Sequence, residues 1–283
     1  MGDVAGDYQL LRSGVGAVRL GRDAVLVSGP DAVTFLQGQC SQDVAGLAVG
    51  GSAWSLVLQP QGKVDALVRL TRVAPDTVVL DTDAGWGSLV IERLKRFKLR
   101  VKADLEPLAW GCVGLRGPTA AVAASGIAAG PELLVVDAGW PGLPGIDLLG
   151  PEPPLPAGVS EVSAEAFEVA RIEAGIPVMG SELTERTIPA EAGIVNRTVS
   201  FTKGCYTGQE LVARIDSRGG NVPRHLRGVV LTAGAVPVGA ALHVGGKRVG
   251  ALTSVAVTAE GSVVALAYVG RDVEPPAEAT ATW

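Results

Sequence analysis

Cysteine is scarce in this sequence of 283 residues, and histidine is scarcer still. The three cysteines, Cys40, Cys112 and Cys205, lie far apart, and the sequence has no Cys-x-x-Cys pair and no Cys/His cluster. This spacing gives little support to a structural zinc site or to an iron–sulfur cluster held only by protein ligands. An odd number of cysteines leaves at least one thiol unpaired, which suits a reducing compartment. His225 and His243 have no partner visible in the sequence, so a histidine-based catalytic triad is not expected.

Long apolar runs are also missing. No stretch approaches the ~18 uninterrupted apolar residues of a membrane-spanning helix. The first residues include Asp3 and Asp7 and lack the apolar centre of a signal peptide. We therefore expect a cytoplasmic protein without membrane contact. The formal net charge of −5 argues against a general coat for nucleic acid.

Aromatic residues make up only 4% of the chain, so the core must consist mainly of aliphatic side chains. A hydrophobic content of 47% is nevertheless enough for a packed core and argues against disorder. Strand and helix patterns are mixed without strict βαβ alternation, which favours an α+β fold over a doubly wound sheet. We expect strands at 24–28, 54–58, 64–73, 77–80 and 98–102, and helices from a Ser28 cap to about 37, at 88–97 and from a Ser163 cap to about 174.

The strands at 54–58 and 64–73 should form a hairpin through the turn Gln59-Pro60-Gln61-Gly62. In the second strand, alternate residues should face opposite sides, with Val64, Ala66, Val68 and Leu70 opposite Lys63, Asp65, Leu67 and Arg69.

The chain is expected to divide near residue 221. Residues 1–220 should form a region of two α+β parts, with a loop or linker rich in Pro and Gly near 139–158. Residues 221–283 contain short β-type runs at 227–231, 241–244, 248–257 and 263–269, and Gly245-Gly246 is a tight turn between two of them. This pattern predicts a small antiparallel β-barrel domain at the C-terminus.

The segment from Phe201 to Gly219 is the richest in candidate chemistry. Thr207 and Glu210 have the spacing of a capping box, which predicts a helix from about Gly208. Just before this helix, Lys203, Gly204 and Cys205 place a cation, a flexible residue and a thiol at a helix N-terminus, where an anion or a thiolate would be stabilised. Spacing alone favours a plainer interpretation, a capped helix with a solvated lysine and an ordinary buried thiol.

The run Lys-Gly-Cys-Tyr-Thr-Gly-Gln-Glu at 203–210 resembles the signature of the YgfZ family. These proteins are folate-binding, tRNA-modifying relatives of the glycine-cleavage T-protein (aminomethyltransferase) and are linked to making or repairing iron–sulfur proteins. Further blocks are similar to the family in the same order, and together they cover nearly the whole chain; they lie at 35–43, 61–63, 96–100, 171–177 and 188–191.

The resemblance implies a ring-like fold of two α+β, ferredoxin-like parts and a C-terminal barrel, with tetrahydrofolate or a one-carbon derivative in a central channel. It implies that Glu173 holds the pteridine, as the matching glutamate does in the T-protein, and that Cys205 is the reactive group with Lys203 as its electrostatic activator. No metal site is implied. The other residues expected at the folate site are Arg171, Tyr206, Gly204, Gly208, Gln209, Glu210, Arg214 and Asp65.

Two features separate this chain from the T-protein. Cys205 and Gln209 stand where the T-protein has Asp and Arg, and of the two adjacent acids in its hairpin strand at most Asp65 survives. We therefore expect a tetrahydrofolate-binding protein that supports assembly or repair of iron–sulfur enzymes. An aminomethyltransferase using Asp65 and a non-catalytic scaffold are the alternatives, and whether the protein is an enzyme stays open.

The basic run at 93–102 and the five tryptophans are further candidates for ligand or partner binding. The run contains six cations and is interpreted first as a solvated surface; the alternatives are docking of the glutamate tail of folate, an acidic partner or RNA. One of the tryptophans could stack on a pterin, although core packing is the default for each. We expect a monomer that can bind iron–sulfur client or assembly proteins.

Overall fold

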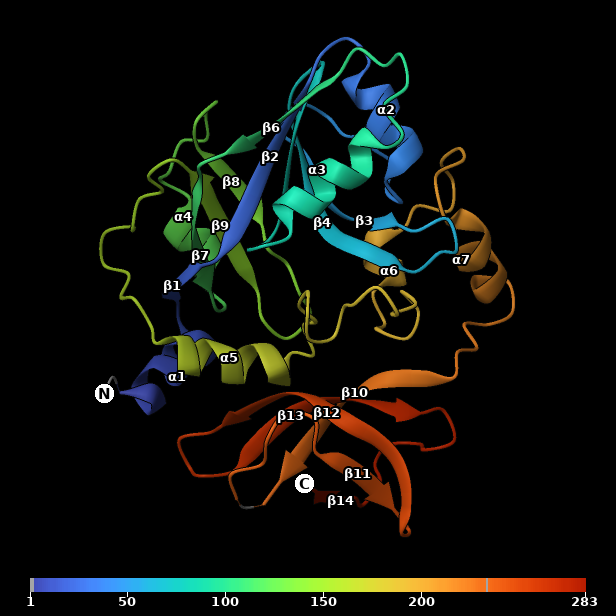
Figure 1. Ribbon diagram of the computed structural model, residues 1–283. Coiled ribbons are helices and arrows are strands. Elements are labelled where there is room, and N and C mark those ends of the chain that lie inside the picture. Colours follow the sequence, from blue (N-terminus) through green and yellow to red (C-terminus); the bar gives the residue numbers. More distant parts are fainter. Residues whose placement is uncertain (1–2, 233) are drawn as a thin grey trace.

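Three antiparallel sheets form the frame of the molecule (Figure 1). The structure is a computed structural model that describes residues 3–232 and 234–283. The first sheet has the order β1 (Gly16–Leu20), β7 (Gly111–Arg116), β9 (Gly145–Gly150) and β8 (Leu134–Asp137). The second has the order β3 (Ser52–Leu58), β4 (Val64–Ala74), β5 (Thr77–Asp83), β2 (Arg22–Ser28) and β6 (Asp104–Leu108).

Helices α2 (Ala32–Gln39) and α3 (Gly87–Lys95) cover one face of the second sheet. The alternation predicted for the hairpin strand is confirmed from Ala66 to Leu70, but not before Ala66, because Val64 packs with Leu67 and Asp65 bonds to Arg93 of α3. Ala66, Val68 and Leu70 of β4 are fully buried in the core with both helices, whereas Leu67 and Arg69 face the other side. That second side of β4 faces the first sheet and forms part of the candidate site.

The first two sheets are joined where β1 passes into β2 through the single residue Gly21. The first sheet carries the short helix α4 (Ala120–Ala124), and α1 (Val4–Ser13) packs against α5 (Ala164–Glu173) beside it. Ser163 begins α5 as predicted, because its hydroxyl accepts a hydrogen bond from the amide of Ala166. The last two helices are α6 (Val195–Thr198) and α7 (Gln209–Asp216).

The third sheet is C-terminal and has the order β10 (Arg224–Leu231), β13 (Val263–Gly270), β12 (Lys247–Val257), β11 (Ala241–Val244) and β14 (Thr280–Thr282). In Figure 1 it lies beneath α5. Val169 and Ile172 of α5 pack on Val264 and Leu266 of β13, so α5 is the apolar bridge between the third sheet and the rest of the molecule. The strands β10 and β14 form the two edges of this sheet; closure into a barrel stays a prediction.

Three local predictions were wrong. Residues 98–102 form no strand, because Arg100 has a left-handed φ of 58° that interrupts extended backbone. Ser28 does not cap α2, since it is the last residue of β2 and Asp31 takes the cap position. The stretch 139–158 is not all loop, because β9 lies inside it with Leu148 and Leu149 buried.

Candidate functional site

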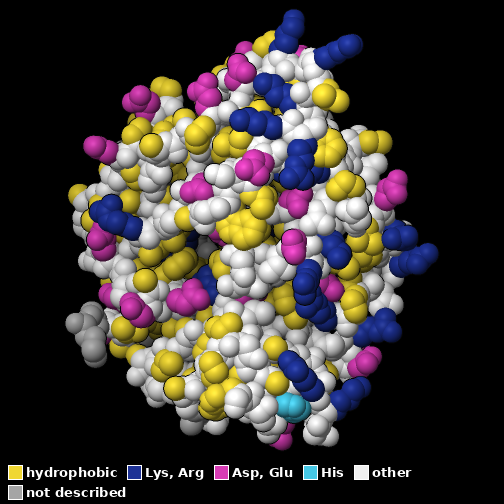
Figure 2. All heavy atoms as spheres, viewed as in Figure 1, with side chains coloured by type: hydrophobic (Ala, Val, Ile, Leu, Met, Phe, Trp, Pro, Cys, Tyr) yellow, Lys and Arg dark blue, Asp and Glu magenta, His cyan; other side chains and the backbone are white. Residues whose placement is uncertain are grey.

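A cavity of about 290 Å³ lies between the first and second sheets. One wall is formed by the connection between β1 and β2 and by the face of the second sheet that is not covered by α2 and α3. The other parts of the wall come from the first sheet, from α5 and from the segment 176–179. Figure 2 shows a hollow near the middle of this face of the molecule, with basic and acidic side chains at its edge. The residues that line the cavity are Leu20, Gly21, Arg22, Trp54, Leu67, Asp83, Arg116, Ala138, Trp140, Asp147, Phe167, Glu168, Arg171, Ile176, Pro177, Val178 and Met179.

A buried network of charges supports this cavity from behind. Arg69 is fully buried, and its guanidinium donates two hydrogen bonds of 3.0 Å to Asp81 and one of 2.8 Å to Asp147. Arg22 connects the same Asp81 to Asp83, to which it donates at 2.8 Å. Buried charges of this kind cost much free energy unless they are paired. Their pairing therefore fixes the positions of the cavity residues Arg22, Asp83 and Asp147.

Asp147 joins the two sheets. Its carboxylate lies 2.7 Å from Arg116 of the first sheet and 2.8 Å from Arg69 of the second. Burial alone would raise the pKa of Asp147, but the guanidinium groups of Arg116 and Arg69 outweigh burial and hold that pKa well below its usual range. Asp147 is thus ionised throughout the physiological range.

Two tryptophans form the aromatic part of the wall. The ring centroids of Trp54 and Trp140 are 5.7 Å apart, with the planes tilted by 54°. The guanidinium groups of Arg22 and Arg69 lie 5.4 and 5.1 Å from the Trp54 ring. The Nε1–H of Trp54 is buried and has no hydrogen-bond acceptor among the described residues. A buried donor without a partner is costly.

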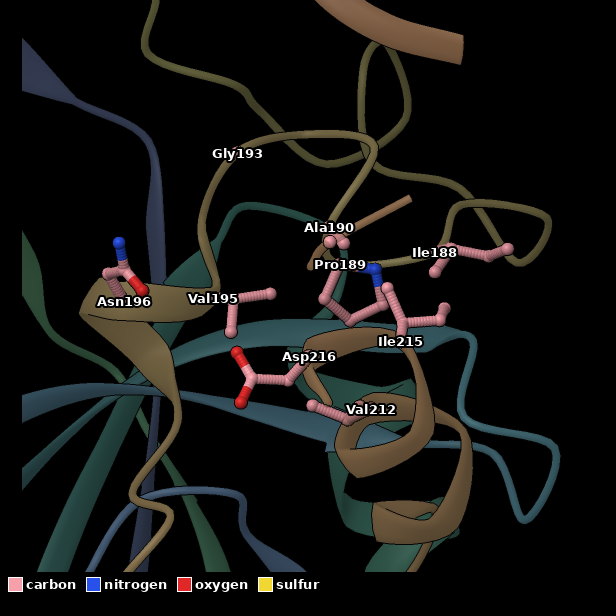
Figure 3. Close-up of a pocket in the computed structure, with 10 residues that line it drawn as sticks. Ile188, Pro189, Ala190, Gly193, Val195, Asn196, Val212, Ile215 and Asp216 are labelled. Atoms are coloured by element: carbon pink, nitrogen blue, oxygen red, sulfur yellow. The ribbon is translucent and has the colours of Figure 1, made fainter. Parts of the chain in front are cut away.

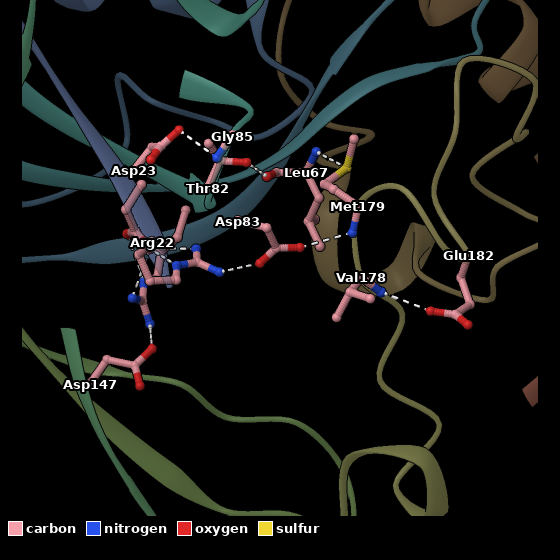
Figure 4. Close-up of polar contacts among 12 residues, drawn as sticks. Arg22, Asp23, Leu67, Thr82, Asp83, Gly85, Asp147, Val178, Met179 and Glu182 are labelled. Atoms are coloured by element: carbon pink, nitrogen blue, oxygen red, sulfur yellow. Dashed lines mark hydrogen bonds and ion pairs between the residues drawn. The ribbon is translucent and has the colours of Figure 1, made fainter. Parts of the chain in front are cut away.

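The segment 176–179 closes another side of the cavity and is held by several hydrogen bonds, some of which Figure 4 shows. The amide of Met179 donates to Asp83 at 2.9 Å, and the amide of Val178 donates to the fully buried Glu182 at 3.1 Å. Glu182 is held in turn by the third sheet, because the hydroxyl of Ser254 donates to its carboxylate at 2.6 Å. The C-terminal sheet therefore supports the segment 176–179 through the buried carboxylate of Glu182.

Among the residues predicted for the folate site, Arg171 lines this cavity. Its guanidinium donates two hydrogen bonds to the carboxylate of Glu168. Burial by itself would lower the pKa of Arg171, but this carboxylate outweighs that effect and raises the pKa. Glu173, two residues later on α5, is exposed, lies outside the lining and accepts a hydrogen bond of 2.5 Å from the hydroxyl of Tyr8. The helical twist explains the difference, since a shift of two positions rotates a side chain to another helix face.

Lys203 does not act on the cavity. Its ammonium group donates to the backbone oxygens of Gln37, Cys40 and Gln42 at 2.6, 2.7 and 2.9 Å, which uses all three of its N–H donors. These oxygens belong to the end of α2 and the turn after it, where a cation is favourable. Burial lowers the pKa of Lys203. Lys203 therefore serves as a helix C-terminal cap, and its role as an activator of Cys205 stays a prediction.

Cys205 is exposed, whereas Cys40 and Cys112 are buried. Neither Cys205 nor Lys203 lines the central cavity. Gly204 is exposed beside the thiol, and Tyr206 is buried in the apolar cluster that also contains Leu58 and Val212. The thiol of Cys205 is thus at the surface, while the next residue, Tyr206, fixes the segment by packing into the core.

The helix after this segment begins at Gln209, close to the prediction, but without the predicted capping box. Gly208 takes the cap position with a left-handed φ of 83°, and no side chain caps the helix. Instead, the side-chain oxygen of Gln209 accepts from the amide of Tyr206 at 3.2 Å. Glu210 and Arg214 are exposed, lie outside the cavity lining and form no ion pair within the described residues.

Asp65 also lies outside the cavity lining. Its carboxylate receives a 2.8 Å hydrogen bond from Arg93 of α3, and the residue of β4 that faces the cavity is Leu67. A working acid on this strand, which the aminomethyltransferase alternative requires, is therefore not brought to the cavity.

A second cavity of about 170 Å³ lies beside α7 (Figure 3). It is formed by the loop 188–193, the start of α6 and the C-terminal half of α7. Its lining is mainly aliphatic, with Val195, Val212 and Ile215, and the exposed Asp216 stands among them. Cys205 does not line this cavity either.

The basic run at 93–102 lies away from both cavities. Lys95, Arg96, Arg100 and Lys102 are exposed, and so are the apolar side chains of Phe97 and Leu99. Within residues 3–232 and 234–283, no group of three His, Cys, Asp or Glu residues has an arrangement that could hold a metal ion. In the same part of the chain, no helix is long and apolar enough to cross a membrane.

Sequence reasoning missed most of the cavity. Arg22, Asp83, Arg116 and Asp147 come from four different strands and match no local motif. Arg69 gave a usable signal, because it stands on the face of β4 opposite a fully apolar core face, where a charged residue is unusual.

Comparison with known proteins fits this architecture. The crystal structure of the glycine cleavage system aminomethyltransferase T from Bartonella henselae superposes with a TM-score of 0.83 over 99% of this chain and 85% of its own, at 22% identity, which shows the fold. The "tRNA-modifying protein YgfZ" of Serratia proteamaculans is 28% identical over 274 residues, covering 88% of this chain and 82% of its own. Proteins named aminomethyltransferase are further relatives.

The "iron-sulfur cluster assembly factor IBA57 homolog, mitochondrial" of Neurospora crassa is 28% identical over 237 residues, which are 76% of this chain. The match spans only 54% of the length of that protein. No protein-family model matches the chain. The resemblance read from the run at 203–210 and its companion blocks is thus confirmed by whole-chain similarity.

Proposed function

We propose that this chain, a homologue of proteins named YgfZ and IBA57 with the fold of aminomethyltransferase T, binds a reduced folate in its central cavity and supports assembly or repair of iron–sulfur enzymes. One observation carries the folate proposal. Two indole rings and several charged groups line one cavity, and the buried Nε1–H of Trp54 lacks an acceptor.

A reduced pterin matches these groups. Its flat ring can pack against Trp54 or Trp140. Its carbonyl oxygen can accept from the Nε1–H of Trp54, while its amino and ring N–H groups can donate to the carboxylate of Asp83 or Glu168. The volume of about 290 Å³ is close to the lower end of the roughly 300–1,000 Å³ of small-molecule sites, so the cavity suits the pterin head rather than a whole folate. When bound, the folate would carry a one-carbon unit.

Cys205 is proposed to act at the surface. Its thiol is exposed and lies outside the cavity lining, so it is open to a client protein or to a metal–sulfur centre on that client. Names of relatives that refer to iron–sulfur cluster assembly and to tRNA modification support a client protein or an RNA as the partner. A cytoplasmic location stays part of this proposal.

A titration calorimetry experiment tests the folate proposal. Tetrahydrofolate is titrated into the native protein and into the Trp54→Phe variant, which keeps an aromatic ring but loses the buried N–H. We expect binding to the native protein, and a Kd raised roughly tenfold in the variant because one buried hydrogen bond is lost. Trp110→Phe is the matched control, since Trp110 packs in a different apolar cluster and should leave the Kd unchanged. Absence of binding to the native protein would refute the proposal.

A cellular complementation experiment tests the thiol. Cys205→Ala is expected to lower the activity of iron–sulfur enzymes in cells that lack the native protein. Cys112→Ala is the control, because Cys112 is buried. Full activity with Cys205→Ala would remove the thiol from the function.

The alternative is aminomethyl transfer, which is favoured by the relatives of that name. Because Leu67 faces the cavity on β4 and Asp65 is paired with Arg93, the working acid would have to be another carboxylate of the lining, and Asp83 is the candidate that we test. This alternative predicts methylene-tetrahydrofolate from an aminomethyl donor and loss of that product in Asp83→Asn. A non-catalytic scaffold, in contrast, predicts no thermal shift with tetrahydrofolate.

A further inference from the structure

Arg197 is a partly buried cation without an anion. It lies on α6, and its guanidinium stacks on the ring of Trp140 at 4.8 Å. Its side chain makes no hydrogen bond and no ion pair with any described residue, although Asp137 is near enough to influence it. Burial lowers the pKa of Arg197, and the charge of nearby Asp137 offsets that effect only in part.

The three arginines that line the cavity are already paired. Arg22 is held by Asp81 and Asp83, Arg116 by Asp147, and Arg171 by Glu168. These guanidiniums are therefore largely neutralised by carboxylates that the chain itself supplies. Arg197 differs because its position is fixed by an indole ring rather than by an acid, which leaves its forked N–H groups for an external acceptor.

The place of Arg197 connects it to the cavity. Trp140 lines the cavity and packs against Trp54, so Arg197 adjoins the wall on which a pterin ring would rest. A cavity of about 290 Å³ leaves the remainder of a folate, which ends in glutamyl carboxylates, to extend beyond the wall. A guanidinium and a carboxylate form a strong pair of parallel hydrogen bonds. Arg197 has no such partner in the part of the chain that the structure describes, and a glutamyl carboxylate of the ligand could supply it.

We propose that Arg197, stacked on Trp140, is the subsite for the anionic glutamyl tail of the ligand whose head occupies the central cavity. The inference rests on the proposed function. It assigns the tail to α6 rather than to the basic run at 93–102, because Arg197 stacks directly on Trp140 of the cavity lining. It also predicts that affinity rises with the tail carboxylates rather than with the pterin ring alone.

The test separates tail from head by using three probes: 6-methyl-tetrahydropterin, tetrahydrofolate with one glutamyl group, and tetrahydrofolate with several. Each is titrated into the native protein, Arg197→Gln, Arg197→Lys and the control Arg218→Gln, which changes an exposed arginine just after α7. Calorimetry gives the Kd of each probe for each variant.

We expect Arg197→Gln to raise the Kd of both tailed ligands about tenfold, with the Kd of the tail-less pterin unchanged. Arg197→Lys should keep part of the affinity because it keeps the charge, and Arg218→Gln should match the native protein. If the native protein and Arg197→Gln bind the tailed ligands with equal affinity, the inference about Arg197 is overturned, and the proposed function is not. An equal loss for tailed and tail-less ligands would also overturn it. Failure of the native protein to bind any probe would overturn the proposed function and the inference together.

Discussion

Gly62 of the β3–β4 turn and Gly208 at the start of α7 lie against each other. A Cβ atom added to Gly208 would lie 3.3 Å from the Cα of Gly62 and 2.8 Å from the Cβ of Leu58. One added to Gly62 would lie 2.6 Å from the Cβ of Leu211 on α7. Both glycines have positive φ, 77° and 83°. The hairpin turn and the segment that presents Cys205 are therefore fitted together by two residues that tolerate no side chain.

Substitution of Gly208 by alanine should destabilise the protein by roughly 2–4 kcal/mol, because it combines a left-handed backbone with a steric overlap. Gly204→Ala is the matched control in the same segment, since a Cβ there meets nothing within 4 Å and its φ is not in the left-handed range. Urea unfolding measures both variants. Equal stability of the two would show that the contact with Gly62 does not constrain the fold.

Lys203→Met should cost about 2–3 kcal/mol of stability, because three backbone oxygens at the end of α2 lose a charged donor. The rate at which Cys205 reacts with a disulfide reagent in the folded protein should stay close to the native rate, since the ammonium of Lys203 is directed to these oxygens. Lys95→Met, at an exposed position, is the control for loss of charge. A large fall in thiol reactivity without loss of stability would support the activator role.

Asp147→Asn should destabilise the protein by about 3–5 kcal/mol at neutral pH, because it leaves Arg69 and Arg116 without their shared carboxylate. The pKa of Asp147 is lowered in the folded state, so the unfolded chain binds the proton more readily. The stability that Asp147 contributes is therefore complete above about pH 4, the unfolded pKa, and declines as the pH falls toward the lower folded value.

Urea unfolding at a series of pH values between about 3 and 7 measures this effect. The native protein should lose stability on acidification more steeply than Asp147→Asn does. If the free energy of unfolding of Asp147→Asn falls with pH as steeply as that of the native protein, another group controls the loss of stability in acid.

Ser254→Ala should destabilise the junction with the third sheet by about 1.5–3 kcal/mol, because the buried carboxylate of Glu182 loses a donor. Glu182 also accepts from Val178 in the cavity wall, so amide hydrogen exchange should speed up at residues 176–179 as well as in the third sheet. Thr253→Val is the control, since its hydroxyl bonds only to Leu266 within its own sheet. Faster exchange confined to the third sheet would contradict the link.

The sequence predicts elements better than it predicts the cavity, and the reasons are physical. The hairpin of β3 and β4 has both a period of two and a turn sequence, so its strands and faces could be derived from local pattern. Helix α5 likewise has a capping serine before its first apolar turn. Such features depend on neighbours along the chain.

The cavity depends on contacts between distant segments. Asp147 meets Arg69 across 78 residues, and Lys203 meets the end of α2 across more than 160. No local pattern shows that Lys203 is directed to carbonyl oxygens or that Glu173 is turned toward Tyr8. The segment at 203–210 was recognisable from its residues, but its position relative to the cavity required the coordinates.

The single residue Gly21 between β1 and β2 has a mechanical consequence. The two strands cannot move far apart at this point, and the buried Asp147, which pairs with Arg116 of the first sheet and Arg69 of the second, also holds the sheets together. We expect any widening that admits a ligand to come from the opposite wall, where α5 packs on the C-terminal sheet and residues 176–179 are linked to it through Glu182. The rate of ligand exchange would then depend on how easily the C-terminal sheet moves.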